Sequence, residues 1–155
     1  MAYLLGLDAL RAIVADEADD HPVKRWRRAA GLAGVRDEEI FISVVAVGIL
    51  EDMLARFDRG APAARTAFEH NVRITLPVIF RGRIIAVDEL IARQWGRLRS
   101  IRDAGDRLVP SETLLILSTA LVTGMAYVGR RLDWMAQLRP LGLTVIDPWE
   151  GPPGP

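Results

Sequence analysis

Five short apolar segments, separated by longer stretches with helical periodicity, constrain the fold of this chain more than any other feature. The segments cover residues 3–7, 40–44, 83–87, 125–128 and 143–146. They are rich in Leu, Ile and Val, which is typical of strands buried on both faces. Such strands, alternating with helices, form a parallel sheet covered by helices on both sides. We therefore predict a three-layer α/β fold with a central, mostly parallel sheet of about five strands.

Capping residues and prolines predict where the helices begin. The expected first residues are Asp8, His21 with Pro22, Val45, Pro62, Asp88 and Pro110. Asp8 and Asp88 are expected to be N-caps, because their carboxylates can accept hydrogen bonds from the free N–H groups of a first turn. Pro77 should end or kink the fourth helix, since it lacks an N–H group. The helix after Pro110 is apolar on all sides, which predicts a central position.

Composition limits the classes of function. A chain of 155 residues suits one domain, here residues 1–150, followed by a Gly/Pro tail at 151–155 that we expect to be flexible. Without cysteine, disulfides and thiolate metal sites are excluded and a reducing cytoplasm is a suitable location. No apolar stretch reaches the ~18 residues of a membrane span, so no membrane contact is expected. Twenty basic and twenty acidic residues cancel, so no global field attracts nucleic acid.

One basic run offers a local nucleic-acid site. Lys24, Arg25, Arg27 and Arg28 flank Trp26 and could together grip phosphates. We favour the alternative, in which these cations form the solvated face of a helix whose tryptophan belongs to the core. The two histidines have no ligand spacing, and neither a nucleophile elbow nor a phosphate-binding loop is present.

Several segments resemble one known family. They are residues 3–5, 40–48, 87–99, 110–124 and 147–149. The closest match runs from Val87-Asp88-Glu89 to Trp95-Gly96-Arg97-Leu98-Arg99, which resembles the pattern V-D-x-x-x-A-x-x-W-G-x-L-R. The chain is thereby similar, over roughly residues 2–150, to the VapC/FitB-like branch of the PIN-domain family.

The resemblance implies a PIN-like fold and an endoribonuclease of toxin–antitoxin type. Proteins of this family form homodimers and are wrapped by a small antitoxin, whose segment lies in the groove over the active site. They cleave RNA with acidic residues that hold Mg²⁺ or Mn²⁺, hard cations that prefer oxygen ligands. The metal makes a nucleophile from water and stabilises the phosphoryl oxygens.

The principal acids of this family are absent from the chain. The matching positions are Gly6, Ile49, Thr113 and Arg131. Arg131 places a cation in the set, and we expect it to lie where the metal would be. The sequence therefore predicts that the catalytic metal site, and with it any Mg²⁺ or Mn²⁺ cofactor, is lost.

Four other acids lie near the vacated positions and could rebuild the site. They are Asp8, Glu51, Glu112 and Asp133. Glu51 is two helical residues from Ile49 and should be turned by ~200° away from it. Asp8 and Glu112 are the best candidate ligands. Asp8 competes with its role as an N-cap, and Glu112 with that of a first-turn acid favoured by the helix dipole.

Three functional hypotheses remain. The chain is a catalytically eroded PIN protein that binds a protein partner or RNA, a weak Mg²⁺- or Mn²⁺-dependent endoribonuclease with a rearranged site, or a structural subunit of PIN ancestry. Metal binding separates the second from the others, and partner binding separates the first from the third. We favour the first. We also expect Gly6→Asp with Ile49→Glu and Thr113→Asp to restore metal binding.

Overall fold

The computed structural model describes residues 1–57 and 60–151, and the predicted tail beyond Gly151 lies outside this range. Its centre is a five-stranded sheet in the order β3-β2-β1-β4-β5, and every pairing is parallel. The strands are β1 (Tyr3–Leu5), β2 (Ile40–Ser43), β3 (Ile84–Ile85), β4 (Ala126–Val128) and β5 (Val145–Ile146). The predicted sheet is confirmed. The segments 83–87 and 143–146 are shorter than predicted, because each is an edge strand with a single hydrogen-bonding neighbour.

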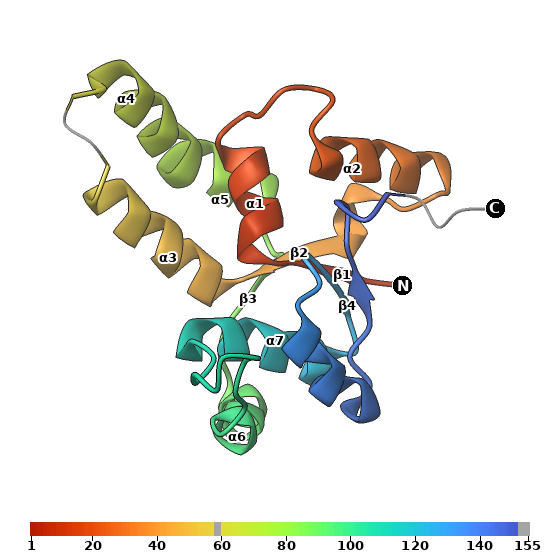
Figure 1. Cartoon of the computed structure of the whole chain (residues 1–155). Helices are drawn as coiled ribbons and strands as arrows, with labels where there is room; N and C mark the ends of the chain where they lie inside the picture. Colours follow the sequence, from red (N-terminus) through yellow and green to blue (C-terminus); the bar gives the residue numbers. More distant parts are fainter. Residues whose placement is uncertain (58–59, 152–155) are drawn as a thin grey trace.

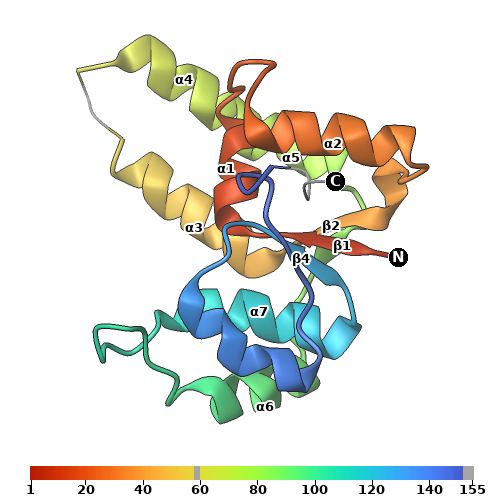
Figure 2. The same cartoon turned by 45° about the vertical axis from the view of Figure 1, so that its right-hand side comes forward.

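Helices cover both faces of the sheet, as predicted. They are α1 (Leu7–Val14), α2 (Pro22–Leu32), α3 (Val44–Ala55), α4 (Pro62–His70), α5 (Leu76–Ile79), α6 (Glu89–Leu98) and α7 (Ser111–Thr123). Short 3₁₀ helices span Asp37–Glu39 and Asp133–Leu141. Figure 1 shows α1, α2 and α5 on one side of the sheet and α6 and α7 on the other. Figure 2 shows the same three layers after a turn of 45°.

Most helix starts lie where the sequence placed them. Asp88 caps α6 by accepting a hydrogen bond of 2.9 Å from the N–H of Ile91, and the Nδ1 atom of His21 accepts one of 3.2 Å from Val23 at the start of α2. The prediction for Asp8 is wrong. β1 ends at Leu5, so the N-cap of α1 is Gly6 and Asp8 lies within the first turn.

Pro77 distorts its helix as expected. The chain between α4 and α5 is π-helical at Asn71–Thr75, and Pro77 is the second residue of α5. Since proline lacks an N–H group and clashes with the turn before it, a widened turn accommodates it.

The core joins the sheet to the apolar helix α7. Leu114, Leu117 and Ala120 of α7 are buried, as are Leu4 and Ile42 of the sheet. α7 packs against both α3 and α6, which confirms its predicted central position. Among residues 1–57 and 60–151, no helix has the length and apolar character needed to cross a membrane.

Candidate functional site

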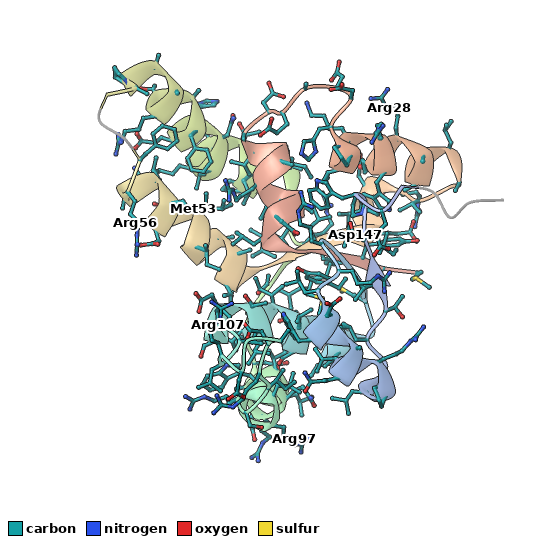
Figure 3. The ribbon with its side chains drawn as sticks, viewed as in Figure 1. Arg28, Met53, Arg56, Arg97, Arg107 and Asp147 are labelled. Carbon is teal, nitrogen blue, oxygen red and sulfur yellow. The ribbon has the colours of Figure 1, made fainter. Side chains whose placement is uncertain are left out.

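The carboxyl edge of the sheet gathers residues from distant parts of the chain, as expected for parallel strands. β1 pairs with β4 in the register Leu5↔Val128, so Gly6 and Gly129 follow two neighbouring strands at the same level. The N–H of Gly6 donates a hydrogen bond of 2.8 Å to the carbonyl oxygen of Val128. Asp147, labelled in Figure 3, follows β5 on the other side of β4. This edge is the place where the sequence locates the vacated metal site.

The side chain of Tyr127 fills the space beside Gly6. Tyr127 lies opposite Leu4, and because side chains alternate along strands, Gly6 and Gly129 lie on the same face as this pair. A Cβ atom on Gly6 would lie 2.5 Å from Cζ and 2.8 Å from Cε2 of Tyr127, and closer still to its hydroxyl. The backbone at Gly6 is extended (φ −69°, ψ 166°) and open to any residue. Glycine is therefore required here by space and not by backbone conformation.

Gly129 is crowded by the same ring. A Cβ atom there would lie 2.8 Å from Cε1 of Tyr127 and 2.7 Å from Oδ1 of Asp8. Tyr127 is only 6% exposed. Burial raises the pKa of its phenol, and the carboxylates of Asp8 and Asp147 raise it further. The phenol is therefore neutral at ordinary pH, which does not suit it to act as a base or as an anionic ligand.

Asp8 lies at this edge, where it holds the backbone. Its Oδ2 atom accepts a hydrogen bond of 2.7 Å from the N–H of Arg130, and its Oδ1 atom accepts one of 2.9 Å from Ala9. Asp8 thus connects the start of α1 to the loop after β4.

Asp147 has a similar role on the β5 side. Its two oxygens accept hydrogen bonds of 2.7 Å from the N–H of Arg131 and 2.8 Å from that of Trp149. The sequence analysis did not predict Asp147 or Tyr127 as site residues. The pattern Tyr127-x-Gly129, a large residue followed by a small one on the same face, is the signal that could have indicated the tyrosine.

The guanidinium of Arg131 is bound by residues on and after β5. Its Nε atom pairs with Glu150 at 3.1 Å, and its Nη2 atom donates a hydrogen bond of 2.9 Å to the carbonyl oxygen of Val145. These acceptors hold the guanidinium at the sheet's outer strand, and its position relative to a metal stays a prediction. The neighbouring Arg130 stacks over the ring of Trp149 at 4.3 Å.

The remaining matched positions lie on helices, and the candidate acids there form no ligand cluster among the described residues. Ile49 and Thr113 are half-buried on α3 and α7. Glu51 pairs with Arg73 at 3.1 Å, and this bond, together with the charge of Arg73, lowers the pKa of its carboxyl. Glu112 is exposed in the first turn of α7, and Asp133 is exposed at the start of the last 3₁₀ helix.

These residues do not fit a divalent ion. Among residues 1–57 and 60–151, no group of three or more His, Asp or Glu side chains could hold one. Mg²⁺ and Mn²⁺ require several oxygen ligands. The edge instead offers a buried phenol and two carboxylates that already accept backbone N–H groups.

The basic run of α2 is largely paired within the protein. The Nζ atom of Lys24 lies 3.2 Å from a carboxylate oxygen of Asp16, and Arg27 pairs with Asp37. Arg28, labelled in Figure 3, donates a hydrogen bond of 2.6 Å to the carbonyl oxygen of Asp19. Arg25 is exposed. The phosphates of a nucleic acid would have to displace the partners of Lys24, Arg27 and Arg28.

A groove of about 950 Å³ lies between α1, α2, α5 and β2. Its apolar lining consists of Leu5, Ile13, Val23, Trp26, Leu32, Ile40, Ile79 and Phe80. The charged residues along it are Lys24, Arg27, Arg28, Arg83 and Asp37, four cations and one acid. The groove is therefore apolar with a net positive lining.

Comparisons with solved structures show the fold. FitAcB from Neisseria gonorrhoeae has a TM-score of 0.72 at 18% identity, covering 95% of this chain and 98% of that one. FitAB bound to the IR36 DNA fragment has a TM-score of 0.70 at 20% identity, covering 95% of both chains. VapBC2 from Rickettsia felis, bound to a DNA fragment from its promoter, has a TM-score of 0.65 at 17% identity. The match covers 95% of this chain and 98% of that one. No family model matches the chain, and no curated protein does.

The fold is therefore the PIN-type fold of the FitB and VapC structures, as the sequence resemblance implied.

Proposed function

We propose that this chain is a VapC-like PIN protein of toxin–antitoxin type that acts by binding a protein partner and has lost metal-dependent endoribonuclease activity. The groove between α1, α2 and α5 carries this proposal, because it offers a large apolar surface with positive charge along it. An amphipathic helix binds such a groove with its apolar face. The partner that suits it is a small antitoxin-like protein with acidic residues flanking an apolar stripe.

The loss of catalysis is supported by the carboxyl edge. The four positions that match the catalytic acids are Gly6, Ile49, Thr113 and Arg131. Asp8 accepts backbone hydrogen bonds and Glu51 pairs with Arg73, so neither is free to rebuild the site. This arrangement favours the eroded protein over the weak Mg²⁺- or Mn²⁺-dependent nuclease.

Calorimetric titration with Mn²⁺, beside cleavage of a mixed RNA substrate, tests the loss of activity. We expect neither heat at stoichiometric metal nor metal-dependent cleavage. Both signals in the wild type, and their loss in Asp8→Ala, would instead establish a rebuilt nuclease.

Titration with an amphipathic helical peptide, whose apolar stripe is flanked by acidic residues, tests the partner. Ile79 lines the groove and is 47% exposed, so Ile79→Glu should fold normally while placing a negative charge against an acidic partner. Loss of one apolar contact of about 1.5–3 kcal/mol weakens binding roughly ten- to hundredfold. Ile74→Glu is the matched control, since Ile74 is exposed on the neighbouring turn and does not line this groove. Equal affinities for the two variants would rule the groove out.

We also propose that the chain forms a homodimer in the cytoplasm. Val44 follows β2 and Val87 follows β3, at the same edge of the sheet, and Leu90 lies in the first turn of α6. All three apolar side chains are exposed. Sedimentation velocity should show a dimer that Leu90→Asp converts to a monomer, and a monomeric wild type at all concentrations would contradict this. RNA is the less favoured partner, because the groove is lined mainly by apolar side chains, whereas nucleic-acid affinity comes mainly from contacts to phosphates.

A further inference from the structure

We infer that Tyr127 by itself excludes a divalent ion from the carboxyl edge, so that restoring the missing carboxylates does not restore the metal site while this tyrosine is present. This inference rests on the proposed loss of the metal site. The lack of negative charge is then not the only obstacle to metal binding, because the side chain of Tyr127 is a second one.

Space is the first argument. An aspartate at position 6 must place its Cβ atom where the Tyr127 ring already lies, 2.5 Å from Cζ, and real Cβ atoms essentially never approach a neighbour within 3.0 Å. The ring has little room to move aside. It is 6% exposed, and Gly129 lies close to its Cε1 edge.

Ligand chemistry is the second argument. An ion that enters this edge must exchange water for protein oxygens. The phenol remains protonated because burial and the neighbouring carboxylates raise its pKa, so it offers no anionic ligand. The oxygens of Asp8 and Asp147 that border the edge accept hydrogen bonds from Arg130 and Arg131. Tyr127 thus occupies volume without providing charge.

The inference changes the expected outcome of the carboxylate variant. Gly6→Asp with Ile49→Glu and Thr113→Asp, predicted from the sequence to restore metal binding, should not bind Mn²⁺ because the new side chain at position 6 would overlap the Tyr127 ring. The same three substitutions combined with Tyr127→Val, a residue suited to a buried strand, should bind it. Tyr127→Phe in place of Tyr127→Val is the matched control, since it removes the hydroxyl but keeps the ring.

Electron paramagnetic resonance of free Mn²⁺ measures binding directly. With equimolar protein, we expect the free-ion signal to fall only for the variant that carries Tyr127→Val. Loss of the signal with the triple variant that retains Tyr127 would overturn the inference, as would an unchanged signal with a folded Tyr127→Val variant.

A stability cycle tests the same contact if the multiple variants do not fold. Gly6→Ala should lower the melting temperature sharply in the wild type and little in the Tyr127→Val background. Equal losses in both backgrounds would show that Tyr127 and residue 6 are not coupled, and would overturn the inference.

The outcomes also separate this inference from the proposed function. Stoichiometric binding of Mn²⁺ by the wild type would contradict the proposed function. Binding by the triple variant but not by the wild type would contradict only the role of Tyr127.

Discussion

Replacing Asp8 with alanine distinguishes a carboxylate that holds the fold together from one that holds a ligand. In the structure the side chain accepts the N–H groups of Ala9 and Arg130, and Arg130 is 122 residues away along the chain. Asp8→Ala should therefore detach the loop after β4 from the start of α1. Asp8→Asn keeps an oxygen acceptor at the same place and should cause a smaller loss.

The magnitude follows from these two hydrogen bonds. A hydrogen bond to a charged group contributes about 1.5–3 kcal/mol, and water replaces part of it at a half-buried residue, so we take about 1.5–2 kcal/mol for Asp8→Ala. In a chain of this size each 1 kcal/mol shifts the melting temperature by about 2–4 °C. The expected decrease is therefore about 3–8 °C.

Thermal unfolding followed by circular dichroism, with EDTA and with Mn²⁺, is the assay. We expect the decrease for Asp8→Ala to be the same in both conditions. A melting temperature equal to that of the wild type would refute the structural role. A wild type stabilised by Mn²⁺, beside an Asp8→Ala variant that is not, would show that Asp8 holds a metal.

Two further predictions concern the phenol and the core. The raised pKa of Tyr127 means that the folded state keeps a proton that the unfolded state loses above the ordinary value of 10.0, so stability should be complete below about pH 10 and fall as the pH rises further. Urea unfolding between pH 8 and pH 11 should show this fall reduced in Tyr127→Phe, and identical pH profiles would contradict the buried phenol. Leu117 is fully buried, so Leu117→Ala should lower the free energy of unfolding by about 2–5 kcal/mol. Leu141→Ala, at a residue 55% exposed, should change it by less than about 0.5 kcal/mol, and similar effects of the two substitutions would contradict the central position of α7.

The error at Asp8 shows how far local rules extend. An aspartate between an apolar strand and an apolar helical pattern has the pattern of an N-cap, and the same rule is correct at Asp88. At Asp8 the N-cap lies two residues earlier, at Gly6, and the carboxylate bonds to Arg130 from the opposite half of the chain. Nothing within a few residues of Asp8 indicates that partner.

The expected carboxylate repair shows the same limit at the site. Matching positions along the chain correctly locates Gly6 at the carboxyl edge, beside the end of β4. Matching positions along the chain gives no information about the space around Gly6. The structure shows that the place is filled by Tyr127, whose Cα pairs with that of Leu4 across the sheet.

The sequence by itself determined the alternation of strands and helices and the central apolar helix. These features follow from hydrophobic periodicity and from capping chemistry, which depend on residues close together in the chain. Only the tertiary structure decided that Tyr127 lies over Gly6, that Asp8 holds Arg130, that Arg131 turns to Glu150, and that α1, α2 and α5 enclose a groove. The physical reason is that each of these contacts joins segments far apart in sequence, and their partners are set by the order and register of the strands and not by local preference.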